Sequence, residues 1–343
     1  MKKLGKIVRS VQAFRREFSR QDVGQSREPA KPFRLGIALG GGFARGIAHV
    51  GVLRVLEKEN IPISYVAGTS VGALIGAIYC SGVSAEEMEK IACRVRFRDF
   101  ARWTISRMGF ASNQRMIGFL SSVLKVKTFE ELRTPLAVTA TDFATGEGAV
   151  FDSGPLVDPV RASCAYPGMF LPVNVNGQLC VDGMLAHPVP THPLRAAGCS
   201  HVLAVHLKGR WGTASGPRHL FDVIGQCFAI AQDKNGALWR PWADLVIEPN
   251  VSAFKYDDFE CTPDLLRSGE EAMRAALPQV KAWLQKDAVQ AGASGFPRIH
   301  PLPADLGAFI QANCAGGQVS PTSEFADSTG GATPSNDPDP GAN

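Results

Sequence analysis

The 343-residue sequence lacks the marks of several broad classes of protein. It holds no run of eighteen apolar residues, so we expect no membrane-spanning helix. Its N-terminus is basic but has neither the apolar segment nor the small-residue cleavage site of a secretory signal. These absences predict a cytoplasmic protein. With 45% hydrophobic and 20% charged residues, the composition is that of an ordinary globular chain, long enough for one large α/β domain with tails.

The eight cysteines form no C-x-x-C pair. Several lie inside apolar runs, among them Cys80 and Cys180. Such spacing is typical of reduced, buried thiols, and it supports neither a disulfide framework nor a metal site. We therefore expect no bound metal.

Positive charge is concentrated at one end of the chain. Residues 1–20 hold seven basic side chains and one acidic one. The net charge of this segment is therefore larger than the +4 of the whole chain, and the remaining residues together are slightly acidic. A nucleic-acid-binding domain would spread its positive charge over a folded face. We therefore expect no nucleic-acid partner.

The same twenty residues have the pattern of an amphipathic helix. Apolar residues follow helical spacing on one arc: Leu4, Ile7, Val8, Val11, Phe14 and Phe18. A basic helix of this kind can lie in the headgroup region of an anionic membrane, or it can pack on the body of its own protein. Residues 1–32 are thus predicted to form a basic helix and a linker, with peripheral contact at the inner face of the membrane.

From Phe33 onward, short apolar strands alternate with helical patterns. The predicted strands cover residues 34–39, 63–68, 136–141, 149–152, 179–181, 202–207 and 245–248. The predicted helices cover residues 44–59, 71–80, 85–95, 113–124, 156–165, 220–239 and 263–285. Alternation of this kind predicts an α/β domain over residues 33–286, with a mostly parallel sheet covered on both faces. Residues 287–343 are expected to be an extension, disordered from about residue 315, where small and polar residues dominate.

The pentapeptide Gly68-Thr69-Ser70-Val71-Gly72 lies where a predicted strand ends and a predicted helix begins. That is the setting of a nucleophile elbow, in which a sharp turn exposes the serine and the small flanking residues Gly68 and Gly72 avoid clashes. The N-terminus of the helix points free N–H groups and a positive dipole end at the serine oxygen. Ser70 is therefore the candidate nucleophile.

A glycine-rich loop follows the first predicted strand, with the sequence Gly40-Gly41-Gly42-Phe43-Ala44-Arg45-Gly46. Its spacing differs from the dinucleotide-binding fingerprint, and no Gly-Lys-Ser/Thr follows as in a P-loop. Beside the serine motif, the loop is better interpreted as an oxyanion hole formed by the N–H groups of Gly40, Gly41 and Gly42. Arg45 then either stabilises the loop or contacts a lipid phosphate.

A serine nucleophile needs a base, and the local sequence leaves that choice open. His187 and His192 lie in a proline-rich loop and are possible bases, whereas His49 and His206 have the settings of structural histidines. Asp182 ends a short apolar strand, and Gly183 lets the backbone turn so that the carboxylate can face a cleft. The same Asp-Gly dipeptide is also common in plain turns.

Taken in order, the motifs Gly40-x-Gly42-x-x-Arg45-Gly46, Gly68-x-Ser70-x-Gly72 and Asp182-Gly183 resemble the patatin-like phospholipase family. Residues 161–170 (R-A-S-C-A-Y-P-G-M-F) look like the segment that precedes the aspartate strand in that family. The similarity covers roughly residues 33–250 and is closest to the compact bacterial members. One departure is Met184, which stands where the family usually has glycine or alanine.

The resemblance implies a three-layer α/β/α sandwich and a Ser–Asp dyad without a catalytic histidine. Ser70 would be the nucleophile, Asp182 the base, and the Gly40–Gly42 amides the oxyanion hole. It also implies hydrolysis of fatty acyl esters of lipids, of the phospholipase A or lysophospholipase type, without any cofactor. Three alternatives remain: a non-catalytic lipid-binding protein on the same fold, an esterase with a histidine base, and a nucleotide-binding module whose glycine loop would bind phosphate.

Overall fold

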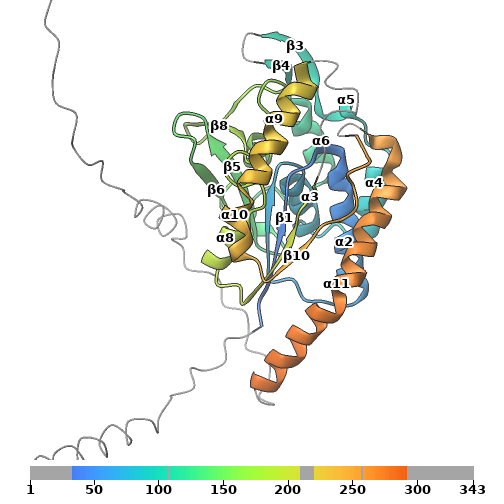
Figure 1. The fold of residues 1–343 in the computed structure, drawn as a ribbon. Helices are drawn as coiled ribbons and strands as arrows, with labels where there is room; N and C mark the ends of the chain where they lie inside the picture. Colours follow the sequence, from blue (N-terminus) through green and yellow to red (C-terminus); the bar gives the residue numbers. More distant parts are fainter. Residues whose placement is uncertain (1–32, 107–108, 209–219, 256–257, 292–343) are drawn as a thin grey trace, which may run out of the picture. The chain divides into compact units, whose positions relative to one another are not determined.

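The computed structural model describes residues 33–106, 109–208, 220–255 and 258–291, and the account below is confined to them (Figure 1). The predicted N-terminal helix and linker lie outside the described residues, as does the C-terminal extension beyond residue 291. Among the helices of the described part, none has the length and hydropathy needed to cross a bilayer.

A central sheet organises the described part (Figure 1). Its strands are β1 (Leu35–Leu39), β2 (Tyr65–Thr69), β5 (Leu136–Asp142), β6 (Gly148–Phe151), β7 (Val173–Val175), β8 (Gln178–Asp182), β9 (His201–Val205) and β10 (Leu245–Ile247). They follow the order β10-β9-β1-β2-β5-β8-β7, and β6 also pairs with β5. The pairings from β10 to β5 are parallel, whereas β6, β7 and β8 pair antiparallel. The predicted α/β class with a mostly parallel sheet is confirmed.

The two faces of the sheet carry side chains of different size, because successive residues of a strand point to opposite faces. In β1, Leu35, Ile37 and Leu39 enter the larger core, whereas Ala38 faces the smaller one. The larger core packs against α2 (Ile47–Lys58), α3 (Val71–Cys80), α4 (Ala85–Ala92), α6 (Arg115–Val123), α7 (Val157–Ser163) and α11 (Thr262–Ala291). The smaller core packs against α8 (Thr191–Ala196) and α10 (Gly236–Trp239). The result is three layers, α/β/α.

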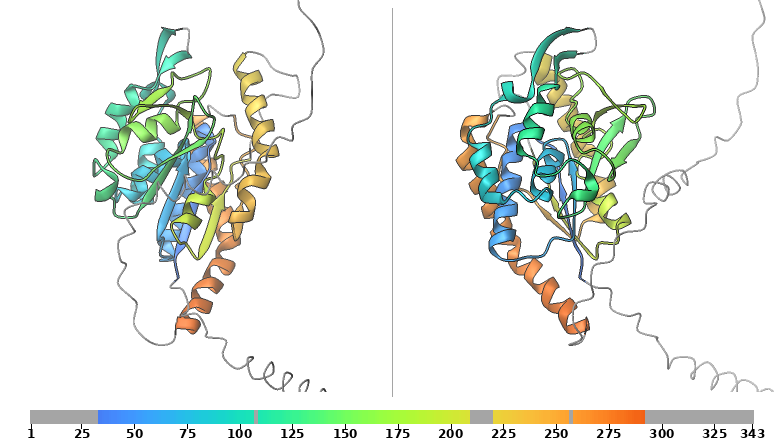
Figure 2. Two further views of the ribbon diagram at one scale, coloured as in Figure 1. Left: turned by 90° about the vertical axis from the view of Figure 1, so that its left-hand side faces the viewer. Right: turned by 180° about the vertical axis from the view of Figure 1, so that it is seen from behind.

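α9 (Leu220–Lys234) lies on the side of the sheet opposite to α3 and α6 (Figure 2, left). One helix was predicted over residues 220–239, but α9 ends at Lys234 and α10 starts at Gly236. At the other edge, α11 packs along α2 and continues to Ala291, past the predicted domain boundary at residue 286.

A separate antiparallel hairpin, β3 (Arg102–Ser106) and β4 (Gly109–Ser112), projects from one end of the described part, next to α5 (Phe97–Phe100) (Figures 1 and 2). No strand was predicted over these residues. Every residue of β1 and of β2 is buried, whereas the hairpin exposes Trp103 and Phe110 and so lacks the continuous buried run by which those strands were recognised.

Candidate active site

Ser70 occupies the turn between β2 and α3, which is the predicted strand–turn–helix setting. Its backbone has φ 54° and ψ −123°, a conformation that is strained for a residue with a Cβ. The side chain is 6% exposed and lines a cavity. A strained turn that presents a serine at a cavity wall is the geometry of a nucleophile elbow.

Asp182 lies within hydrogen-bond distance of Ser70. The Ser70 hydroxyl donates to Oδ2 of Asp182 at 2.7 Å, and the Met184 N–H donates to Oδ1 at 2.9 Å. The carboxyl is almost wholly buried, and this burial raises the pKa of Asp182 to about 7, against the opposing effect of the two hydrogen bonds. A carboxylate with a pKa near neutrality, at this distance from a hydroxyl, can take up the hydroxyl proton.

The sheet topology explains why residues 112 positions apart meet. Leu39 pairs with Gly68 across β1 and β2, so the glycine loop and Ser70 leave the sheet at the same edge. Thr69 pairs with Thr139 of β5, and the next residue of β5, Ala140, pairs with Asp182 of β8. Asp182 therefore ends β8, which is separated from β2 and Ser70 by the single strand β5.

Ser163, at the end of α7, links both parts of this pair. Its hydroxyl accepts a hydrogen bond from the Ser70 N–H at 2.7 Å and donates to the Thr139 carbonyl at 2.6 Å. Its own carbonyl accepts a longer bond, 3.4 Å, from the N–H of Gly183. Ser163 was given no role from the sequence. Only its position within residues 161–170, the segment that resembles the family, could have pointed to it.

The glycine loop is more constrained than predicted. The Gly40 N–H donates to the carbonyl of Val205 at 3.1 Å, and the Gly41 N–H donates to that of Pro188 at 3.2 Å. The Gly42 N–H has no hydrogen-bond acceptor among the described residues. Of the three predicted oxyanion donors, two are thus engaged with backbone carbonyls, and the Gly42 amide is the one without such a partner in the described part of the chain.

Two buried side chains hold this loop from behind. His49 Nε2 lies 2.8 Å from the Gly40 carbonyl, and burial lowers the pKa of His49 to about 4, so the ring is neutral. Arg45 is 2% exposed, its Nε donates to the Gly42 carbonyl at 3.4 Å, and burial lowers its pKa to about 10. Such burial favours the loop-stabilising role for Arg45 over contact with a lipid phosphate.

The remaining motif glycines lie where a Cβ would overlap a neighbour. At Gly72 it would overlap the Leu39 carbonyl, at Gly68 the first turn of α3, at Gly183 the Thr139 carbonyl, and at Gly46 the side chain of Val71. Met184 packs on Gly41 in the same way. These contacts bring the elbow, the glycine loop and the Asp182 turn close together.

The alternative bases lie elsewhere. Neither His187 nor His192 is among the residues that line the cavity at Ser70 in the described part of the chain. The His187 ring packs against Gly148, and burial lowers its pKa to about 4. The His192 ring contacts Trp242 edge-on, with centroids 5.1 Å apart. His206 is 3.0 Å from the carboxylate of Glu248.

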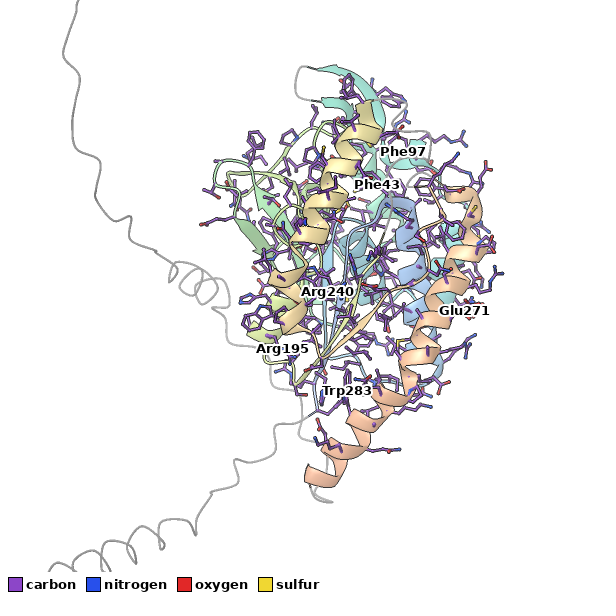
Figure 3. All side chains as sticks on the ribbon, in the orientation of Figure 1. Phe43, Phe97, Arg195, Arg240, Glu271 and Trp283 are labelled. Atoms are coloured by element: carbon purple, nitrogen blue, oxygen red, sulfur yellow. The ribbon has the colours of Figure 1, made fainter. Side chains whose placement is uncertain are left out.

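The cavity beside Ser70 has a volume of about 890 Å³, part of it open to solvent. Apart from Ser70 and Asp182, apolar side chains make up its wall. One side is a face of α3, formed by Val71, Leu74, Ile75 and Ile78. The other sides come from α4, α6 and a group of rings that includes Phe43 and Phe97, both labelled in Figure 3. A deep apolar cavity with a polar pair at its wall suits a long apolar ligand that carries one reactive group.

The comparisons with known proteins agree with this geometry. The patatin-like phospholipase family matches residues 37–195. An uncharacterized NTE family protein of Mycobacterium tuberculosis is 32% identical over 179 residues, which is 51% of this chain and 49% of that protein. Lysophospholipase NTE1 of Mycosarcoma maydis is 28% identical over 228 residues, covering 63% of this chain and 12% of that protein. The chain therefore spans about half the length of the first relative and a small part of the second.

Among solved structures, VipD from Legionella pneumophila aligns with a TM-score of 0.43 and 16% sequence identity, over 72% of this chain and 67% of that one. So distant a likeness adds nothing to the assignment. The family match spans the glycine loop, Ser70 and Asp182 alike. Through residues 37–195, this chain is a member of the patatin-like phospholipase family.

Proposed function

We propose that this protein hydrolyses acyl esters of lipids, with Ser70 as nucleophile and Asp182 as general base. The observation that carries the proposal is the 2.7 Å hydrogen bond from the Ser70 hydroxyl to Asp182, at the wall of an apolar cavity. Family membership supports the same conclusion, as does the similarity to lysophospholipase NTE1 of Mycosarcoma maydis.

In the first half-reaction, Ser70 Oγ attacks the ester carbonyl carbon while its proton passes to Oδ2 of Asp182. The carbonyl oxygen becomes an oxyanion, which the Gly42 N–H and the N–H groups of the first turn of α3 would stabilise. When the intermediate collapses, the C–O bond to the alcohol breaks and Asp182 returns its proton to the leaving oxygen. An acyl-enzyme remains on Ser70.

In the second half-reaction, a water molecule attacks the acyl carbon and Asp182 takes its proton. Collapse of the new intermediate expels Ser70 Oγ, which regains the proton, and releases the fatty acid. A neutral pKa suits Asp182 to both halves, because it must accept a proton in one step and return it in the next.

The decisive experiment is a panel of acyl esters, from p-nitrophenyl butyrate to lysophospholipid, given to the wild type, Ser70→Ala and Asp182→Asn. We expect the wild type to turn over, Ser70→Ala to lose both activity and labelling by a fluorophosphonate probe, and Asp182→Asn to lose activity by a factor on the order of 10³ or more. Equal labelling of Ser70→Ala and the wild type would disprove the assignment.

Two rival functions give different results when His187→Ala and His192→Ala are added to the same panel. A non-catalytic lipid-binding protein would retain lipid but show no turnover in the wild type. An esterase with a histidine base would lose activity in His187→Ala or His192→Ala, while Asp182→Asn would be mild.

A further inference from the structure

One end of the described part of the chain combines exposed aromatic side chains with exposed arginines. It consists of the β3–β4 hairpin, the segment around α5 that leads into it, and the start of α9, which rises to the same end in every view (Figures 1 and 2). We name it the rim surface and define it by these exposed residues: Arg96, Arg98, Arg102, Trp103, Phe110, Leu220 and Val223.

Four large apolar side chains of the rim surface are strongly exposed to solvent. Trp103 is 67% exposed, Phe110 49%, Leu220 57% and Val223 45%. In β4, Phe110 is exposed between two buried residues, and Trp103 of β3 pairs with the buried neighbour Ala111. Because strand residues alternate between faces, Trp103 and Phe110 lie on opposite faces of the hairpin. A flat protein partner would cover one face, whereas the interface of a lipid bilayer surrounds both.

The exposed charged side chains that define the rim surface are all positive. Arg96, Arg98 and Arg102 are all exposed, and none of the three has an ion pair among the described residues. The one acid between them, Asp99, accepts a hydrogen bond from the backbone N–H of Arg96. Arginines that interleave with aromatic rings match an anionic headgroup layer over an apolar interior.

The rim surface is continuous with the wall of the cavity. The ring of Trp103 lies 6.3 Å from that of Phe97, which lines the cavity, and Phe97 lies 6.1 Å from Phe170, which lines it as well. Backbone bonds fix the hairpin to the same wall: the Ala111 N–H donates to the Met169 carbonyl at 2.8 Å. In Figure 3, Phe43 and Phe97 lie below the hairpin.

We infer that the rim surface docks on an anionic lipid bilayer. The hairpin inserts Trp103 and Phe110 at the level of the headgroups, the arginines bind lipid phosphates, and an acyl chain passes by Phe97 into the cavity. This surface is distinct from the predicted helix of residues 1–20. The delivery of a substrate chain rests on the proposed function, but the docking itself does not.

Binding is measured with the full-length chain carrying Ser70→Ala, so that the vesicles stay intact. The vesicles contain phosphatidylcholine alone or with an equal amount of phosphatidylglycerol, and bound protein is separated by sedimentation. Adding Arg96→Gln, Arg98→Gln and Arg102→Gln together should weaken binding to the anionic vesicles on the order of 100-fold. Adding Trp103→Ser with Phe110→Ser should weaken it by a factor of about 10 or more.

Matched controls lie away from the rim surface. Leu238 of α10 is 68% exposed, as much as Trp103, so Leu238→Ser tests the loss of an equally exposed apolar side chain. Arg267→Gln, Arg274→Gln and Lys286→Gln on α11 remove the same charge as the arginine triple variant. Both controls should bind like the parent. Equal loss in the controls, or no loss in the rim variants, would overturn the inference.

The depth to which the hairpin enters the bilayer is tested by tryptophan fluorescence. Lipids brominated in the acyl chain should quench part of the tryptophan emission, and that part should disappear in Trp103→Phe. Quenching that persists in full would mean that another tryptophan enters the bilayer, and it would refute the role of the hairpin. A dimer dissociated by Val223→Ser would equally refute it, since the surface would then join two copies of this chain.

Failure of docking and failure of catalysis are separable. The rim residues Trp103 and Phe110 do not line the cavity, so their variants should hydrolyse soluble p-nitrophenyl butyrate like the wild type. Vesicle binding without any turnover by the wild type would reject the proposed function and leave the docking surface standing. Turnover of the soluble ester with unchanged vesicle binding in the rim variants would reject only the docking surface.

Discussion

The Ser70 N–H donates to the hydroxyl of Ser163 at 2.7 Å, and this bond ties the backbone of the strained turn to the end of α7. The same hydroxyl donates to the Thr139 carbonyl of β5, so the position of Ser70 is set by a strand that pairs with β8 on its other side. Ser163 is therefore a positioning residue: it touches the backbone of the nucleophile and not the reacting atoms.

Replacing Ser163 by alanine tests this role. The variant leaves a buried N–H without an acceptor, which should cost about 1–3 kcal/mol of stability, and the serine should lose its fixed position. We expect kcat for a soluble ester to fall at least tenfold with little change in KM. The matched control is Ser81→Ala, a second buried serine whose hydroxyl donates to the Ile78 carbonyl. It should lose stability but keep kcat; equal kcat in both variants would remove the positioning role.

The pH dependence of activity distinguishes the possible bases. A general base acts in its deprotonated form, so kcat/KM should rise with pH through the pKa of Asp182, about 7, and level off above it. A base at His187, with a pKa of about 4, would already be deprotonated and give a flat profile from pH 6 upward. A pH–rate profile between pH 5 and 9 on a soluble ester decides between them.

The free energy of unfolding should also depend on pH through the Asp182 carboxyl. Because burial raises its pKa from an ordinary 3.8 to about 7, the folded state holds the proton more tightly than the unfolded state. The stability that Asp182 contributes is therefore fully present below pH 3.8 and is lost as the pH rises to about 7. Denaturant unfolding of the wild type and Asp182→Asn at pH 5 and 8 should show the variant gaining relative to the wild type at the higher pH.

The length of the acyl chain should depend on Ile78. It lies on the cavity face of α3, seven residues beyond Val71, and so about 10 Å further along the helix from the serine. Ile78→Phe fills that part of the cavity and should lower kcat/KM for long-chain esters about 10-fold or more while sparing butyrate. Ile78→Val should shift the preference in the opposite direction. An unchanged chain-length profile in both would place the acyl chain elsewhere.

Because α3 lies very close to β1 at Gly72, adding a single methyl group at this residue should strongly destabilise the protein. Gly72→Ala would place its Cβ on the Leu39 carbonyl, so we expect several kcal/mol of destabilisation and loss of activity. Gly118→Ala in α6, where nothing lies within 4 Å of the added atom, should instead stabilise by about 0.5–1 kcal/mol. Thermal unfolding of the two variants makes the comparison.

The predicted helix at the N-terminus has its own test. Deleting residues 1–30 should reduce activity on anionic liposomes and leave activity on a soluble p-nitrophenyl ester unchanged, since a basic amphipathic helix acts at the membrane and not in the cavity. Equal loss on both substrates, or no loss on either, would remove the membrane role from these residues.

Local sequence patterns were enough to predict the strands, the turn and the loop that carry the candidate site residues. The β2–α3 junction at Ser70, the strand that ends at Asp182 and the glycine loop after β1 all follow from short apolar runs bounded by glycine, because backbone geometry and burial act over a few residues. The identity of the base was not decided locally: Asp182-Gly183 has the sequence of a plain turn, and His187 remained a possible partner. The preference for Asp182 came from the order of the motifs along the chain.

Contacts between distant segments decided the rest. Register across β5 brings Asp182 within 2.7 Å of Ser70, and burial there moves its pKa to about 7. The carbonyls of Val205 and Pro188 accept from the amides of Gly40 and Gly41, whereas the Gly42 amide has no acceptor among the residues that the structure describes. Hydrogen-bond partners, desolvation and the exposure of Trp103 depend on which segments fold together, so only the tertiary structure could determine them. The sequence by itself determined the fold class and the candidate nucleophile, because these depend on the spacing of residues along one segment.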